Sequence, residues 1–190
     1  MAGSVLKNME PVWEKSRGHY HYPALAKPRA IEIPNGGAAY NFQTRETLVD
    51  EGFVKKTSEA SGLTPDQVLE GIFVHEIGHY MVYPRTLGML ILGAKMANDF
   101  FGKEGEESVS FIIQTYMDMC TDTASMLEEQ KTGPILDVRC GFQKLKEDKL
   151  NHNVREVMLA YLHHQAKREF ALNEELKPFF EKMLTIDFLD

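Results

Sequence analysis

The sequence predicts an α+β fold that is mainly helical, with a small β-sheet near the N-terminus. Segments with apolar residues at helical spacing follow one another from about residue 61 onward. β-Structure is indicated in one place only, the segment 30–43 (AIEIPNGGAAYNFQ). Strands confined to the first third of a chain, followed by a run of helices, are typical of α+β domains.

The segment 30–43 has the pattern of a β-hairpin. Apolar and polar residues alternate first, a Pro-Asn-Gly-Gly turn follows at 34–37, and a second short strand comes after it. Both features are typical of antiparallel strands joined by a tight turn.

The best-marked helix spans 61–83 (SGLTPDQVLEGIFVHEIGHYMVY). Thr64 is a good N-cap residue, Pro65 suits the first helical position, and Gln67 completes a capping box. Gly78 lies in the helix interior, where glycine costs about 1 kcal/mol relative to alanine. We therefore expect another backbone to approach the helix closely at Gly78.

The rest of the chain is predicted to be helical with one ambiguous stretch. Pro84 marks the end of the helix that precedes it. Further helices are expected at 86–102, 108–130, 153–170 and 174–184, the second of them ended by the Thr-Gly-Pro at 132–134, while 136–145 (LDVRCGFQKL) is ambiguous.

Length and composition indicate one globular domain. The chain has 190 residues, of which 43% are hydrophobic and 26% are charged. We expect an N-terminal arm at 1–28, a core at 29–135 that carries the functional site, and a C-terminal helical subdomain at 136–190.

Charge and cysteine content limit the partners and the compartment. The net charge is -7 and there is no long basic cluster, so we expect no binding to nucleic acid. The most apolar run, 87–101, contains Lys95 and Asp99 and is too short to span a membrane. Two cysteines do not make a disulfide framework. The expected protein is cytoplasmic and binds no membrane.

A metal-binding motif lies in the best-marked helix. In VHEIGHY (74–80), His75 and His79 are one helical turn apart, so both imidazoles can reach one zinc ion. Glu76 lies roughly 100° around the helix from His75, where it can act as general base toward a zinc-bound water. The alternative is an ordinary helix with two incidental histidines, because the motif also occurs by chance.

Two familiar sources of a third ligand are excluded. Catalytic zinc usually has three protein ligands and one open position. A metzincin site needs a third histidine six residues after His79, where the chain has Arg85. A deformylase-like site needs a cysteine before the helix, and both Cys120 and Cys140 follow it.

Asp118 and Asp122 are the favoured acidic residues. They lie four residues apart in a largely apolar helix, and buried carboxylates need a partner. We interpret Asp118 as the third metal ligand and Asp122 as the group that orients a ligand histidine through its second ring nitrogen. Rivals for the third ligand are Asp122, Glu128 and Glu129. The alternative for the pair is a solvated stripe on an amphipathic helix.

VHEIGHY, followed some 40 residues later by MDMCTDTA, resembles the gluzincin clan of zinc metallopeptidases. The resemblance is to their small members, the minigluzincins, and to microbial metallopeptidase-like domains with aspartate as third ligand. It covers roughly residues 30–130. The usual gluzincin pair is E-x-x-x-D, so Asp118 has a shorter reach than the usual glutamate. The resemblance implies a zincin-like core whose small sheet packs on the motif helix.

The motif and the resemblance together predict a zinc-dependent metallopeptidase. It would hydrolyse peptide bonds in a peptide or protein substrate with a metal-activated water and Glu76 as general base. The strand at 38–43 (AAYNFQ) would form the rim of the cleft, and substrate would pair with it. Candidates for the oxyanion stabiliser, among which the sequence does not choose, are Tyr116, Arg139, His152, His163 and His164.

Two other interpretations remain open. One is a latent enzyme whose cleft is covered by residues 1–28 or by the C-terminal helices. The other is a non-catalytic, zinc-stabilised module that acts as a regulatory or interaction protein. His19 and His21, in GHYHYP (18–23), fit a solvated aromatic arm better than a metal site or a segment occupying the cleft.

Overall fold

Helices dominate the computed structural model, which confirms the α+β prediction. It describes residues 4–34, 36–82, 88, 91, 92, 95, 106–127, 132–145 and 149–186. Within these residues, strands occur only between Arg29 and Val49. Most of the helix predicted at 86–102 lies outside the described residues, as do Pro84, Glu128 and Glu129.

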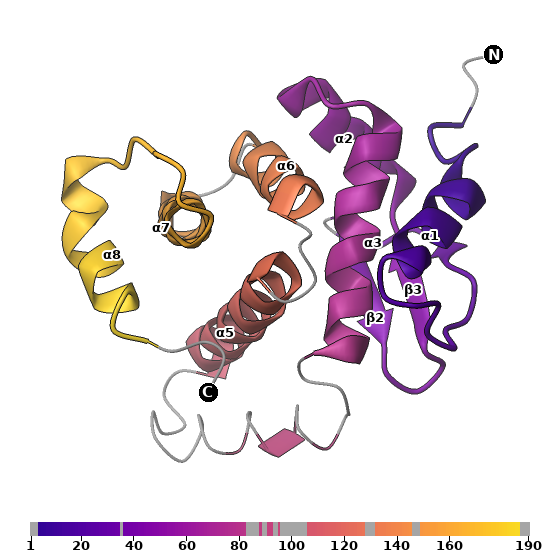
Figure 1. Ribbon diagram of the computed structural model, residues 1–190, viewed down its shortest axis with the longest axis horizontal. Helices are drawn as coiled ribbons and strands as arrows, with labels where there is room; N and C mark the ends of the chain where they lie inside the picture. Colours follow the sequence, from indigo (N-terminus) through magenta and orange to yellow (C-terminus); the bar gives the residue numbers. More distant parts are fainter. Residues whose placement is uncertain are drawn as a thin grey trace.

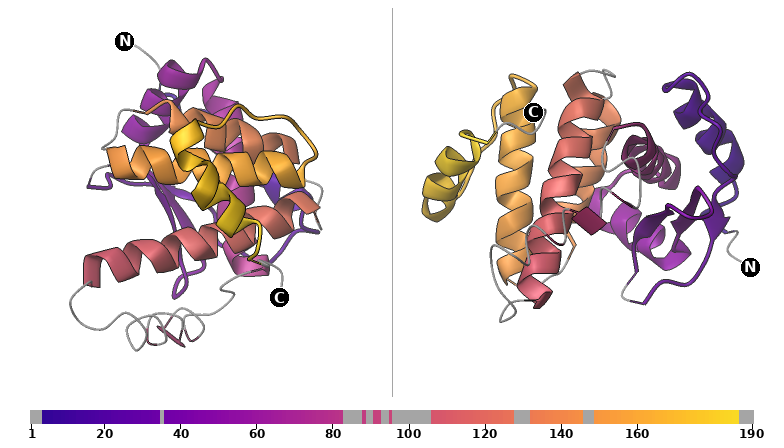
Figure 2. Two further views of the ribbon diagram at one scale, coloured as in Figure 1. Left: turned by 90° about the vertical axis from the view of Figure 1, so that its left-hand side faces the viewer. Right: turned by 90° about the horizontal axis from the view of Figure 1, so that it is seen from below.

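The described helices are α1 (Met9–Gly18), α2 (Glu51–Ser61), α3 (Pro65–Met81), α5 (Glu106–Leu127), α6 (Thr132–Gln143), α7 (Lys149–Gln165) and α8 (Lys177–Met183), the last preceded by a 3-10 turn at Glu174–Leu176. They form successive layers on either side of α3 (Figures 1 and 2). On one side α5 and α6 pack against α3, followed by α7 and then α8, and on the other side lie α1 and the sheet. None of the described helices has the length and apolar character needed to cross a membrane.

A three-stranded sheet lies beside α3, in the order β1-β3-β2. Its strands are β1 (Arg29–Ala30), β2 (Ala38–Asn41) and β3 (Glu46–Val49). β3 pairs antiparallel with β2 and parallel with β1. The predicted pairing within 30–43 is therefore wrong, because β3 separates the two expected partners. β3 takes the central place since alternate side chains, Thr47 and Val49, are fully buried.

α3 begins as the sequence predicts and is the most buried helix of the core. Gln67 N–H donates to Thr64 Oγ1 (3.3 Å), and Thr64 N–H donates to Gln67 Oε1 (2.9 Å), which confirms the capping box. Nearly every residue from Val68 to Gly78 is buried. A helix buried all round is a central helix.

Two glycines let neighbouring helices approach α3. A Cβ at Gly71 would lie 2.4 Å from Val138 Cβ on α6, and one at Gly78 would lie 2.6 Å from Thr121 Cγ2 on α5. Gly78 is therefore a place of close packing, but the expectation of a neighbouring backbone is wrong, because the nearest atoms belong to side chains of α5. α6 and α5 are held at these distances only because α3 lacks side chains at both positions.

The N-terminal segment contributes to the core. Trp13 of α1 is fully buried, and so is Tyr20, just after α1. The Tyr20 hydroxyl donates to the Val74 carbonyl of α3 (3.0 Å) and lies 2.8 Å from Ser125 Oγ of α5. The expectation of a solvated arm is therefore wrong for Tyr20, whereas Tyr22 is 63% exposed.

We predict that Gly71→Ala lowers the free energy of unfolding by about 1 to 3 kcal/mol, although alanine is the better helix former. The added methyl group would meet Val138 and also the Pro134 carbonyl oxygen, at 2.7 Å. Urea unfolding followed by circular dichroism measures the change. Gly133→Ala is the matched control, because no atom of the described residues lies within 4 Å of its Cβ position. Equal stability of the two variants would contradict the close approach of α6.

Tyr20→Phe is expected to destabilise the protein by about 1 kcal/mol, because it removes a buried hydroxyl that links α3 to α5. Tyr22→Phe, at an exposed position, should change stability by less than about 0.5 kcal/mol. Thermal and urea unfolding of both variants measure the difference. If Tyr20→Phe were as stable as Tyr22→Phe, the hydroxyl contacts would have no energetic role.

Candidate metal centre

Two histidines of α3 face each other across one helical turn. His75 and His79 have their Nε2 atoms 3.1 Å apart. Both side chains are largely buried. Residues four apart on a helix lie on the same face, which is why the spacing in VHEIGHY brings the rings together.

An aspartate of α5 completes the cluster. Asp118 Oδ1 lies 3.6 Å from the Nε2 atom of His75 and 3.6 Å from that of His79. These three ligand atoms lie within 4.8 Å of one another, so the group could hold a metal ion. The close approach of α5 at Gly78 is what brings Asp118 within this distance.

The second nitrogen of each imidazole is held by α5. His75 Nδ1 lies 2.7 Å from Asp122 Oδ1, and His79 Nδ1 lies 3.2 Å from Thr121 Oγ1. An ionised carboxylate only accepts hydrogen bonds, so His75 Nδ1 carries the proton. Such contacts fix the orientation of each ring and point its Nε2 atom toward the other histidine.

An arginine of α6 joins the two acids. Arg139 Nε donates to Asp122 Oδ2 (2.5 Å), and Arg139 Nη2 donates to Asp118 Oδ2 (3.3 Å). The Arg139 side chain is 10% exposed. Sequence reasoning considered Arg139 only as an oxyanion stabiliser, because 136–145 was ambiguous. The feature of the sequence that could have indicated its role is its place among apolar residues, because a buried arginine needs an acidic partner.

Burial and close charges shift the pKa values of this cluster. Burial alone would lower the pKa of His75, but the adjacent carboxylates of Asp122 and Asp118 outweigh it and raise that pKa to about 10. Burial would raise the pKa of both aspartates, but His75 and Arg139 hold the pKa of each below its usual value. Burial raises the pKa of Glu76. A metal ion and a proton would compete for Nε2 of His75, because only an unprotonated imidazole nitrogen binds a metal.

The two acids are not on a solvated surface. The Asp122 side chain is fully buried and that of Asp118 is 20% exposed. The alternative of a solvated stripe is therefore wrong, and both carboxylates have the partners that buried charges require. Of the two, Asp118 is the one that faces the Nε2 atoms, while Asp122 faces the Nδ1 atom of His75.

The other four oxyanion candidates are one tyrosine of α5 and three histidines of α7. Tyr116 is on α5 and is 40% exposed. The other candidates have the following neighbours: His152 lies 3.9 Å from Glu156, His163 Nε2 lies 4.0 Å from Cys140 Sγ, and the ring of His164 packs on that of Phe180. Among the described residues, the metal-binding group contains only His75, His79 and Asp118.

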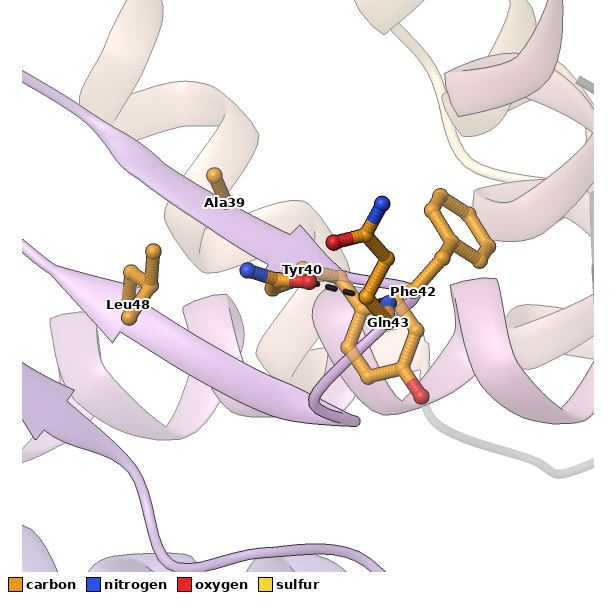
Figure 3. A pocket seen from close by; sticks show the side chains of 6 residues that line it. Ala39, Tyr40, Phe42, Gln43 and Leu48 are labelled. Atoms are coloured by element: carbon orange, nitrogen blue, oxygen red, sulfur yellow. Dashed lines mark hydrogen bonds between the residues drawn. The ribbon is translucent and has the colours of Figure 1, made fainter. Parts of the chain in front are cut away.

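A hollow lies at the tip of the β2–β3 hairpin (Figure 3). It is lined by Ala39, Tyr40, Asn41, Phe42, Gln43 and Leu48, and none of the three candidate ligands is among them. Tyr40 connects this hairpin to α3, because its ring centroid lies 6.2 Å from that of Tyr80, the residue after His79. β2 therefore runs beside the end of α3 that carries the histidines (Figure 1).

Comparison of the chain with protein families, with characterised proteins and with solved structures gives no match. Arguments about function therefore depend on the residues themselves.

We predict that zinc raises the thermal unfolding temperature of the wild-type protein. A ligand at 100 times its dissociation constant adds about 2.7 kcal/mol to stability. Asp118→Asn should lose most of this increase, because it removes a charged ligand from the cluster. Asp137→Asn, at an exposed position on α6, is the matched control and should keep the increase. Differential scanning fluorimetry with and without zinc measures both; an unchanged response in Asp118→Asn would exclude Asp118 as a ligand.

Proposed function

We propose that the protein is a zinc-dependent metallopeptidase with a zincin-like core of the gluzincin type. The observation that carries the proposal is the convergence of His75, His79 and Asp118 beside Glu76, which follows His75 on the same helix. Two imidazoles, one carboxylate and an adjacent acid are the groups that this chemistry requires.

The spacing of the three ligand atoms supports zinc. Ligands at 2.0 to 2.1 Å from a tetrahedral zinc ion are about 3.3 to 3.4 Å from one another. The observed separations of 3.1, 3.6 and 3.6 Å are close to that value. The ion would therefore fit with small adjustments of side chains, and a fourth position would remain for water.

Glu76 has the properties of a general base. Its side chain is buried, and burial raises its pKa from that of an ordinary glutamate. An acid with a raised pKa exchanges protons more readily near neutral pH. When bound, zinc would activate a water molecule and polarise the scissile carbonyl. Glu76 would accept a proton from that water and donate it to the leaving amine.

The sheet offers a place for an extended substrate. β2 is an edge strand of the sheet, with β3 on its only paired side among the described strands. An extended peptide could add to β2 by backbone hydrogen bonds, as in other cases of strand addition. The contact between Tyr40 and Tyr80 would keep such a peptide close to the histidines. We propose a peptide or flexible protein segment as the substrate, and a cytoplasmic location stays a prediction.

Glu76→Gln is expected to lower the rate of peptide hydrolysis by about 100-fold or more, because general base catalysis typically contributes that amount. Zinc binding should be kept. The experiment incubates zinc-loaded protein with a peptide library and identifies the products by mass spectrometry. Glu59→Gln, at an exposed position on α2, is the control and should cleave at the wild-type rate.

The same experiment separates the enzyme from a non-catalytic module. Zinc binding without any cleavage that depends on Glu76 would contradict the peptidase and favour a zinc-stabilised regulatory or interaction protein. Cleavage by wild type and by Glu59→Gln, but not by Glu76→Gln, is the result that the proposal predicts.

A further inference from the structure

Arg139 lies between the two acids of α5 and contacts each through a different nitrogen. Nε donates to Asp122 Oδ2, and Nη2 donates to Asp118 Oδ2. The remaining oxygen of each carboxylate faces a histidine: Asp122 Oδ1 faces His75 Nδ1, and Asp118 Oδ1 faces the Nε2 atoms of His75 and His79. In each carboxylate, Oδ2 is therefore bonded to Arg139 and Oδ1 faces histidine.

We propose that Arg139 is a positioning residue of the metal centre, which restricts Asp118 to binding the ion through Oδ1 alone. This inference depends on the proposed zinc site. A carboxylate with both oxygens free can take two positions on a metal ion. With Oδ2 of Asp118 held by Arg139, that second position stays open for water.

Arg139 also acts on a second ligand through Asp122. The carboxylate of Asp122 fixes the ring of His75, and Arg139 Nε fixes that carboxylate. Two of the three candidate ligands therefore owe their orientation to one side chain. His79 is held separately, by Thr121 of α5.

The fork of a guanidinium is needed for this role, and positive charge alone is not sufficient. Arginine presents several N–H donors in a fixed plane, whereas lysine presents one ammonium on a flexible chain. The plane of Arg139 is supported by Phe142, whose ring centroid lies 5.8 Å from the Arg139 Cζ atom. A lysine at 139 would keep the charge beside the buried Asp122 but could not bond both acids in the same geometry.

The placement of α6 makes the contact possible. Val138, the neighbour of Arg139, packs at Gly71 of α3, so α6 lies against the metal-binding helix. Arg139 on α6 thereby reaches the acids of α5 from a third helix, and the ligand set depends on the relative positions of α3, α5 and α6.

Cobalt(II) substitution tests the proposal without the need for activity. Four-coordinate cobalt(II) absorbs visible light several-fold more strongly than five- or six-coordinate cobalt(II). We expect the wild-type spectrum to be intense and that of Arg139→Lys to be several-fold weaker, since Asp118 then binds through both oxygens. Zinc affinity, measured by competition with a chelator, should fall by about 10- to 100-fold. Arg29→Lys, at an exposed position on β1, should match the wild type.

Each outcome separates the inference from the proposed function. A cobalt spectrum and zinc affinity of Arg139→Lys equal to those of the wild type would overturn the role of Arg139 and leave the metallopeptidase intact. Failure of the wild type to bind either metal would overturn both. Should Arg139→Lys not fold, Arg139→Gln gives the second test, because it keeps one hydrogen-bond donor. An unchanged spectrum in Arg139→Gln would also contradict the proposal.

Discussion

The bond between His75 and Asp122 is the interaction on which the rest of the structure depends. It joins α3 to α5 at 2.7 Å, and Arg139 of α6 holds the other oxygen of the same carboxylate. His75, Asp122 and Arg139 are largely buried, so each depends on its partners for compensation of charge. Removing one partner of a buried ion pair typically lowers the free energy of unfolding by about 3 to 5 kcal/mol. α3, α5 and α6 must therefore pack in positions that allow these side chains to contact one another.

This requirement explains features far from the cluster in sequence. Gly71 and Gly78 leave room for α6 and α5 beside α3, and Tyr20 ties the N-terminal segment to both α3 and α5. All three contacts involve α3, the helix that carries His75 and His79. The core and the candidate metal centre are consequently one unit, in which packing sets the distances between ligand atoms.

The sequence predicted those parts of the site that depend on local spacing. Thr64 and Gln67 marked the start of α3, the four-residue intervals placed His75 above His79, and the apolar setting of Asp118 and Asp122 indicated burial. It did not predict contacts between distant segments. β3 was missed because its four residues are too short to show a period, and the burial of Tyr20 depends on α5, which follows 105 residues later at Ser125. Arg139 lay in a stretch whose helical nature was ambiguous, so the sequence did not show that Asp118 and Asp122 are its partners.

X-ray absorption spectroscopy of the zinc-loaded wild-type protein tests the central claim most directly. We predict one zinc ion with two imidazole nitrogens and oxygen ligands at about 2.0 to 2.1 Å, and no sulfur. The absence of bound zinc, or a shell that contains sulfur or lacks imidazole, would contradict the assignment of His75, His79 and Asp118 as its ligands.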